Sequence, residues 1–121
     1  RWQQPPAASL HSMWAQRLAA VSGAAAVSAG AVGAHALPGH LRKKGLDEAD
    51  VQTYTKVFET GARYHLIHAG VLLCSPFSRQ KVLTASLLAS GQVVFAGSLY
   101  TVAAAGSRDN YAAKTAPVGG A

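Results

Sequence analysis

The sequence predicts an all-α integral membrane protein, a helical bundle with about three transmembrane helices and an amphipathic helix before the second span. Two observations support this fold class. Only 13% of the 121 residues are charged and 50% are hydrophobic, whereas roughly a quarter of a typical soluble domain is charged. Residues 18–37 and 82–107 contain no Asp, Glu, Lys or Arg. As a helix, each run would reach about 30 Å, the thickness of a bilayer's hydrocarbon core.

The basic residues lie mostly at the ends of these apolar runs, where membrane proteins keep cations close to lipid phosphates. Eleven Lys and Arg against five Asp and Glu give a net charge of +6, which favours nucleic-acid binding in a soluble protein. Here the cations form no single stripe, so we exclude nucleic acid as a partner. They include Arg17, Arg42, Lys43, Lys44, Arg79, Lys81, Arg108 and Lys114. A soluble fold is the alternative, but 121 residues leave too little other chain to cover two such helices.

The first predicted span, residues 18–37, consists almost wholly of small residues and follows a polar N-terminal extension, residues 1–17. Small side chains at every fourth position line one face of a helix and let another helix approach to backbone contact. Two such rows are present, Ser22, Ala26, Gly30 and Ala34, and Ala25, Ala29 and Gly33. With Gly23 near its start, this span is expected to pack against protein more than against lipid.

A basic loop and an amphipathic helix are predicted between the first and second spans. Pro38 and Gly39 are expected to end the first helix, because proline supplies no N–H and disfavours helix in the residue before it. The loop runs through Lys44, and residues 46–63 then form a helix with Asp47 as its cap. Its apolar face is predicted from side chains at helical spacing, namely Tyr54, Val57, Phe58, Gly61 and Ala62.

The second predicted span, residues 62–77, is short, and three interpretations of it remain open. It crosses the membrane together with the last turns of the preceding helix, or it is re-entrant, or it lies at the interface. We favour a span, because charged residues lie on both sides and Ser75-Pro76 is typical of a helix stop. The one cysteine, Cys74, is expected to be a small apolar core residue.

The third predicted span covers residues 82–105 and also carries small residues in rows, with Gly91 and Gly97 as further points of close approach. Residues 107–114 are predicted to form a loop. Pro117 then reads as a helix-entry signal, because proline is favoured in the first turn of a helix. Residues 18–121 are therefore expected to form one transmembrane helical domain.

The N-terminal segment favours a mitochondrial location. Residues 1–16 contain Arg and Ser but no acid, which is the composition of a remnant left after a transit peptide is removed. The first residue is Arg1 and not Met, so the chain is expected to be either processed or incomplete. The expected location is therefore an integral position in the mitochondrial inner membrane.

Four stretches, taken in order, resemble one family of small membrane proteins. They are Gly30-Ala31-Val32-Gly33-Ala34-His35-Ala36-Leu37; Phe58-Glu59-Thr60-Gly61 with Tyr64-His65 and His68-Ala69; Phe95-Ala96-Gly97-Ser98-Leu99-Tyr100; and Ala116-Pro117-Val118-Gly119-Gly120. In order and spacing they are similar to the domain of unknown function 423 family, which includes animal transmembrane protein 256. The resemblance covers residues 18–121 and implies an all-helical fold of four spans. In that family the Pro-Val-Gly-Gly segment opens the fourth span, and the sequence stops at this segment, so that span either lies beyond Ala121 or is absent. The resemblance implies no established activity.

Three histidines are the candidates for a metal or haem site. His65 and His68 lie three residues apart and share one helix face, and His35 is the first candidate for a further ligand. The alternative is that these histidines bond to backbone carbonyls, hydroxyl groups or Glu59 inside a bundle. We favour this structural interpretation and expect no cofactor and no bound metal.

Glu59 and Arg63 lie four residues apart, where the amphipathic helix meets the second apolar stretch, and are expected to form an ion pair. Such a pair either fixes the helix at the membrane interface or takes part in a proton relay. We favour the structural role. No residue is predicted to be catalytic, because the sequence shows no phosphate-binding glycine loop, no Ser-His-Asp set and no paired carboxylates, and we expect that the protein is not an enzyme.

The predicted function is that of a structural or accessory subunit of a multisubunit membrane complex. The natural host is an energy-converting assembly of the respiratory-chain type in the mitochondrial inner membrane. The expected partners are the other membrane subunits of that complex and anionic phospholipid, whose head groups would meet Arg42, Lys43 and Lys44.

Two alternative functions remain open. One is a small transporter or proton-handling membrane protein that uses Glu59, His65 and His68, because proton relays in membranes are built from Glu and His side chains. The other is a lipid-binding membrane protein that uses the same basic cluster on anionic head groups.

Overall fold

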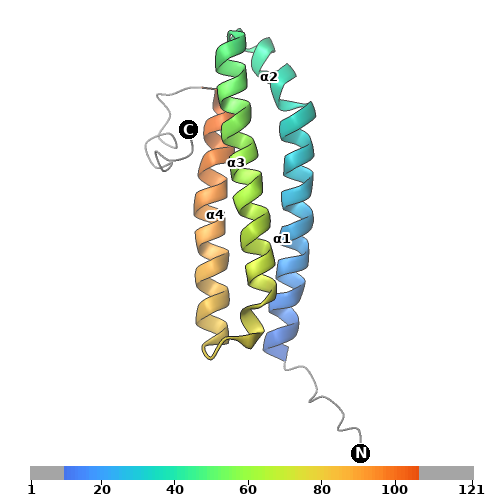
Figure 1. Cartoon of the computed structure of the whole chain (residues 1–121), viewed down its shortest axis with the longest axis vertical. Helices are drawn as coiled ribbons and strands as arrows, with labels where there is room; N and C mark the ends of the chain where they lie inside the picture. The colour runs from blue at the N-terminus through green and yellow to red at the C-terminus, as the bar shows by residue number, and fades with distance from the viewer. Residues whose placement is uncertain (1–9, 107–121) are drawn as a thin grey trace, which may run out of the picture.

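The computed structural model describes residues 10–106, and this part of the chain is helical throughout apart from short turns. Its elements in chain order are α1 (Leu10–His35), α2 (Leu37–Lys43), α3 (Glu48–Leu73), the 3₁₀ helix η1 (Ser75–Phe77) and α4 (Lys81–Ala105). The long helices α1, α3 and α4 run side by side, and each is antiparallel to the next along the chain (Figure 1). The all-α bundle expected from the sequence is confirmed.

The central position belongs to α3. It packs along nearly the whole length of both α1 and α4, whereas α1 and α4 touch each other much less. The short helix α2 joins α1 to α3 at one end of the bundle, and η1 leads from α3 to α4 at the other (Figure 1). Because α3 lies between α1 and α4, polar side chains of α1 and α4 that contact each other also lie close to α3.

Two boundaries of the first helix differ from the prediction. Helix α1 begins at Leu10, so residues 10–17 of the expected polar extension are helical. It ends at His35, and Pro38 lies in the first turn of α2 rather than marking the start of a loop. A first-turn N–H has no partner within its helix, so proline costs nothing there. The predicted basic loop is therefore mostly a short helix.

The amphipathic helix was predicted correctly. The Asp47 carboxylate accepts a hydrogen bond of 2.8 Å from the backbone N–H of Asp50, and α3 continues without a break to Leu73. The helix stop at Ser75-Pro76 is also confirmed, because these residues open η1. Cys74 caps α3 and is exposed, so its predicted place in the core was wrong.

The bundle is apolar outside and lined by small residues inside. Val21, Val93 and Val94 are 69%, 70% and 71% exposed, while Ala19 and Ala96 are buried. A protein in water buries its large apolar side chains, but in a bilayer they can face lipid at no cost while small residues bring the helices together. The exterior of the bundle is therefore suited to a lipid environment.

Two helices of the described residues are long and apolar enough to cross a membrane. They are Met13–His35 within α1 and Lys81–Ala105, which is α4. The central helix α3 has the same length as α1 but carries Lys56 and Glu59 in its first half and Arg63 just past its midpoint. Most of the second predicted span is thus the apolar second half of the continuous helix α3. The first half of α3, which carries ionisable side chains, extends towards α2.

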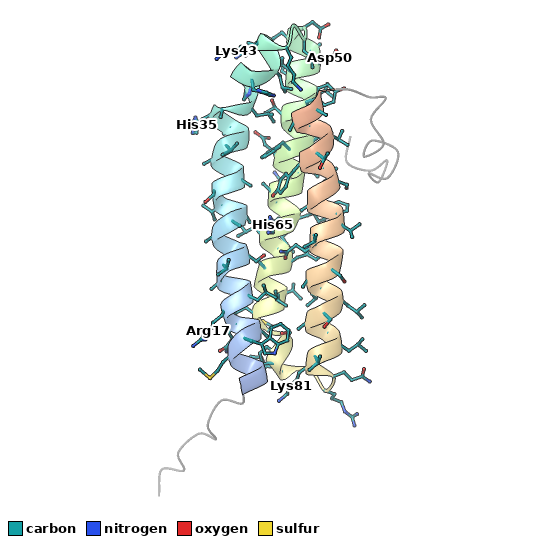
Figure 2. All side chains as sticks on the ribbon, turned by 180° about the vertical axis from the view of Figure 1, so that it is seen from behind. Arg17, His35, Lys43, Asp50, His65 and Lys81 are labelled. Carbon is teal, nitrogen blue, oxygen red and sulfur yellow. The ribbon has the colours of Figure 1, made fainter. Side chains whose placement is uncertain are left out.

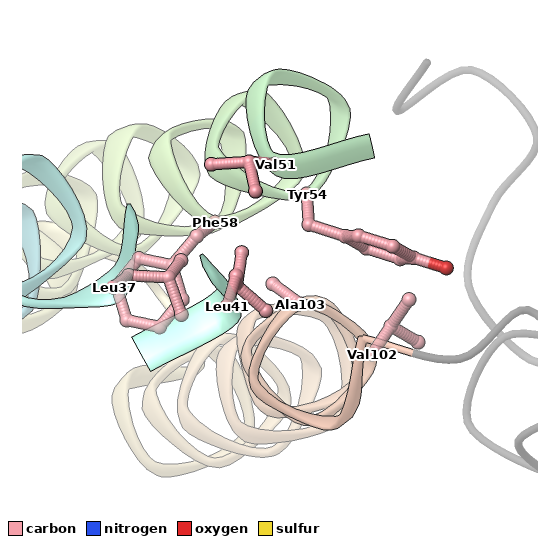
Figure 3. Packing of buried hydrophobic residues seen from close by; sticks show 7 residues of the cluster. All are labelled: Leu37, Leu41, Val51, Tyr54, Phe58, Val102 and Ala103. Carbon is pink, nitrogen blue, oxygen red and sulfur yellow. The ribbon is translucent and has the colours of Figure 1, made fainter. Parts of the chain in front are cut away.

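A cluster of buried hydrophobic side chains lies at the α2 end of the bundle, where α2, the start of α3 and the end of α4 converge (Figure 3). Phe58 of α3 lies against Gly33 of α1 and stacks with Tyr100 of α4 at 4.6 Å between ring centroids. The cluster consists of Leu37, Leu41, Val51, Tyr54, Phe58, Val102 and Ala103. The predicted apolar face of α3 supplies its central members.

The glycines predicted to pack helices divide into two groups. A side chain added at Gly33 would lie 2.6 Å from the Phe58 ring, and one at Gly23 would lie 3.9 Å from Ala69. Positions Gly30, Gly91 and Gly97 have open space within this chain. A row of every fourth residue winds about 40° around the helix per step, so the inner face follows alternating steps of three and four. This drift accounts for Gly30, and at none of the three positions would an added Cβ lie within 4 Å of another described residue.

Candidate functional site

Four polar side chains from all three long helices form one connected network at mid-height in the bundle. Ser22 Oγ of α1 lies 3.1 Å from His65 Nε2 of α3, and Gln92 of α4 donates its side-chain amide to the same Ser22 oxygen. The second ring nitrogen, His65 Nδ1, lies 3.1 Å from the hydroxyl of Tyr100, also on α4. The order of the chain is Gln92, Ser22, His65, Tyr100.

The surroundings of the network are apolar. Ser22 and Gln92 are each 8% exposed and lie near the middle of α1 and α4, the two helices able to cross a membrane. Figure 2 shows His65 about halfway between the two charged ends of the bundle. Polar groups at such a depth must bond to one another, because lipid offers no partner. The network therefore ties α1, α3 and α4 together.

Matching donors to acceptors leaves two directions for the network, one for each tautomer of His65. The Gln92 amide nitrogen donates to Ser22 Oγ, and the only other partner of that oxygen in the described residues is His65 Nε2. If the Ser22 hydroxyl donates to Nε2, the ring proton sits on Nδ1 and is donated to the Tyr100 oxygen. If Nε2 carries the proton, it donates to Ser22 Oγ, and the Tyr100 hydroxyl donates to Nδ1. Each link in the neutral network then has one donor and one acceptor.

A hollow of about 210 Å³ opens beside the network between α3 and α4. It is lined by His65, Gln92, Val93, Ala96, Gly97 and Tyr100. The carbonyl oxygen of the Gln92 side chain, Oε1, is buried and has no hydrogen-bond partner among the described residues. The hollow is therefore lined mostly by apolar surface, and the unpartnered oxygen is buried rather than open to it.

The three predicted histidines are not brought together. His65 points into the network, whereas His68 donates from Nδ1 to the backbone carbonyl of Tyr64 at 2.7 Å on its own helix. His35 is exposed at the end of α1, far along the bundle from His65 (Figure 2). No three His, Cys, Asp or Glu side chains in the described range are grouped so as to hold a metal ion. The bonds of His65 and His68 to hydroxyl and carbonyl groups are those of the structural interpretation.

The predicted ion pair between Glu59 and Arg63 is not formed. Both side chains are exposed, and the ion pair present in the described part of the chain joins Arg42 to Glu48 at 2.7 Å. An exposed pair gains little against the entropy of two long side chains, so spacing alone does not secure it. Glu59 instead borders a shallow hollow of about 300 Å³ at the α2–α3 corner, with Lys56 on the same helix.

The basic cluster predicted to meet lipid head groups is partly engaged within the protein. Arg42 donates twice to the Glu48 carboxylate, at 2.7 and 3.0 Å, which raises the pKa of Arg42 and lowers that of Glu48. Lys44 donates to the carbonyls of Ala104 and Ala105, both at 3.1 Å, and so caps the end of α4. Lys43 is exposed at the same end (Figure 2). Arg42 and Lys44 thus hold α2 against α3 and α4, while Lys43 faces outwards.

Sequence reasoning missed most of this network. His65 was singled out, but Ser22 was considered only as a small residue, and Gln92 and Tyr100 were given no role. The available signal was Gln92 itself, an amide side chain in the middle of a run without charges. A polar group in a span is costly facing lipid and therefore points to a partner inside the bundle.

Apolar helices with large side chains outside and a polar network inside define a small helical membrane protein. A family model described as "Protein of unknown function (DUF423)" matches residues 29–120, and the chain belongs to this family. The UPF0382 membrane protein YwdK of Bacillus subtilis (strain 168) is 38% identical over 90 residues, which cover 69% of this chain and 66% of that relative. No solved structure matches the chain. The predicted family and the membrane location are thereby confirmed.

Proposed function

We propose that this membrane protein is a non-catalytic structural or accessory subunit of a larger membrane complex. The observation that carries the proposal is the open space at Gly30 of α1 and Gly91 of α4. Both glycines lie on apolar helices able to cross a membrane, and a Cβ added at either would have no neighbour within 4 Å among the described residues. Glycine at such a position lets a neighbouring helix approach to backbone contact, whereas lipid gains nothing from it.

The proposed partners are other membrane subunits, with anionic phospholipid at the α2 end. We place the host complex, an energy-converting assembly of the respiratory-chain type, in the mitochondrial inner membrane. This part of the proposal rests on the composition of residues 1–16, which lie outside the described residues. The relative named above comes from a bacterium and carries the membrane location alone.

The test compares two substitutions on α1 in cells that contain the native membrane. Gly30→Leu places apolar bulk where a partner helix is expected, and Val21→Leu places the same leucine side chain at a position that is 69% exposed. We expect Gly30→Leu to insert normally but to co-purify with much less of its partner subunits, while Val21→Leu keeps them. Equal recovery of partners with both variants would show that the Gly30 face meets lipid.

A second candidate function, proton handling, is favoured by one observation. Both ring nitrogens of His65 bond to hydroxyl groups, so a proton can enter at one nitrogen and leave at the other. The carriers in this case are His65, Ser22 and Tyr100, and not the exposed Glu59. Proteoliposomes of purified protein would show pH-dependent proton flux that disappears in His65→Phe and persists in Glu59→Gln. Flux absent from the wild-type chain removes this candidate.

A further inference from the structure

We propose that an apolar groove between α1 and α3 binds one acyl chain of an anionic phospholipid, whose phosphate head group is held by Arg17. The groove lies towards the end of the bundle at which η1 leads from α3 to α4, called the η1 end below. The basic cluster of α2 lies at the opposite end. The inference goes beyond the role of an accessory subunit and does not rest on it, because every residue that it uses belongs to this chain.

The groove is lined by apolar residues alone and has a volume of about 410 Å³. Its walls are Ala19, Ala20 and Gly23 of α1 and four residues of α3 between positions 66 and 73. A Cβ added at Gly23 would lie 3.9 Å from Ala69, so the two helices approach closely at the bottom of the groove. Because its α1 wall belongs to a helix able to cross a membrane, the groove opens towards lipid tails.

The shape of the groove suits a hydrocarbon chain better than a further helix. From Leu66 to Leu73 it extends about 10 Å along α3, at 1.5 Å per residue. Its volume of about 410 Å³ then gives a mean cross-section of about 40 Å², about half that of a helix 10 Å across. A helix could place only side chains in this space, whereas an acyl chain, which is one methylene group wide, fits inside it.

The charges at the η1 end favour an anionic head group. In the described part of the chain, every Asp and Glu lies between residues 47 and 59, and the basic cluster of α2 lies beside them. Arg17, Arg79 and Lys81 lie at the η1 end, and none of them has an ion-pair partner among the described residues (Figure 2). Cations without a counter-charge at a membrane surface attract anionic lipid phosphates. The η1 end therefore has the stronger preference for an anionic lipid.

Arg17 connects this charge to the groove. It is exposed and lies three residues, about one turn of α1, before the groove residue Ala20. A long basic side chain at the end of an apolar helix extends towards the membrane surface. A phospholipid with one tail in the groove therefore places its phosphate within reach of the Arg17 guanidinium, which is suited to bind it through two hydrogen bonds.

The first test uses the purified full chain in nanodiscs that contain equal amounts of phosphatidylglycerol and phosphatidylcholine with identical acyl chains. Native mass spectrometry counts the lipids that remain bound to the released protein. We expect phosphatidylglycerol to be retained about fivefold over phosphatidylcholine, the effect of one Lys or Arg near the head group. Glycerol 3-phosphate, which carries the phosphate without tails, should not displace it. Equal retention of both lipids, or displacement by glycerol 3-phosphate, would contradict the proposal.

Two matched pairs of variants locate the bound lipid. Arg17→Gln should remove the preference for phosphatidylglycerol, whereas Lys43→Gln, which removes an exposed cation at the α2 end, should keep it. Gly70→Leu fills the groove and should prevent retention, whereas Gly91→Leu adds the same side chain at an open position of α4. Gly70→Ala, a smaller change, should weaken retention if the leucine variant fails to fold. A preference that survives in both Arg17→Gln and Gly70→Leu overturns the proposal.

A second copy of the chain is the other occupant that the test can detect. In that case the wild-type chain would be released as a dimer without bound lipid, and Gly70→Leu would convert it to a monomer. We expect instead that Gly70→Leu removes the lipid and leaves the oligomeric state unchanged. A lipid-free dimer that depends on Gly70 would show that the groove is an interface between copies and would overturn the proposed lipid site.

Discussion

Ser22 of α1 accepts a hydrogen bond from the side-chain amide of Gln92 on α4, a residue 70 positions later in the chain. Helices α1 and α4 otherwise touch little, because α3 lies between them over most of their length. The contact therefore closes the bundle into a three-helix arrangement at mid-height, and the same serine oxygen lies 3.1 Å from His65 of α3. A single small hydroxyl group thus joins all three helices.

We expect the Ser22–Gln92 contact to stabilise the bundle by about 1 kcal/mol, the size of hydrogen bonds between membrane helices. Ser22→Ala should cost more than Gln92→Leu, because it leaves a buried amide without its acceptor. The double variant should be no less stable than Ser22→Ala alone. Reversible unfolding in mixed micelles with a denaturing detergent measures all three. Strictly additive losses would show that the two side chains are not coupled.

Gly33 and Gly30 should respond to alanine in opposite directions. A Cβ at Gly33 would lie 2.6 Å from the Phe58 ring, so Gly33→Ala should lower stability by about 1–3 kcal/mol. Gly30 has open space, so Gly30→Ala should leave stability unchanged or raise it by up to about 1 kcal/mol through helix propensity. The same unfolding assay on the isolated chain decides this. A loss in Gly30→Ala equal to that in Gly33→Ala would be incompatible with the packing of α1 on α3.

Glu59 should be dispensable for folding. Its side chain is exposed and forms no ion pair with Arg63, so Glu59→Gln should change stability by less than about 0.5 kcal/mol. The neighbouring control Phe58→Ala removes a buried ring and should cost about 3–5 kcal/mol. Thermal unfolding in detergent compares the two variants. A large loss of stability in Glu59→Gln that is recovered by adding Arg63→Gln would contradict this expectation. It would support the ion pair that the sequence spacing predicted.

The carboxyl of Glu48 should titrate at lower pH than an ordinary glutamate. The hydrogen bond from Arg42 lowers its pKa, so the stability that this contact gives is present above the unfolded-state pKa. It is lost as the pH falls through the lower pKa of the folded protein. A carbon-detected titration of Glu48 should show a midpoint that rises in Arg42→Gln. An unchanged midpoint in that variant would mean that the contact is not kept in solution.

The elements of the fold follow closely from local sequence. Asp47 caps α3 because its carboxylate reaches a backbone N–H three residues on, a relation that is visible in the sequence. Pro38 was misread because the same residue can end one helix or begin the next, and only the path of the chain decides between them. Cys74 was misplaced because small size does not show which side of a helix end faces the core.

The candidate site could be predicted only in part. His65 stood out as an ionisable group in an apolar helix, but its partners Ser22 and Tyr100 lie 43 and 35 residues away. Their meeting depends on how α1 and α4 are rotated about α3. The inner face of α1 follows steps of three and four rather than a constant four, and this small difference leaves Gly30 half-buried and without a close packing neighbour. Contacts between residues on different helices therefore could not be predicted from the spacing of residues in the sequence.

The composition of the assembly that holds this chain tests the accessory-subunit role most directly. The chain is isolated from its native membrane in a mild detergent, and the subunits of the assembly are counted by quantitative mass spectrometry. We expect a complex in which this chain occurs in a fixed ratio to other membrane subunits. A chain recovered alone, or only with copies of itself, would contradict the proposed function.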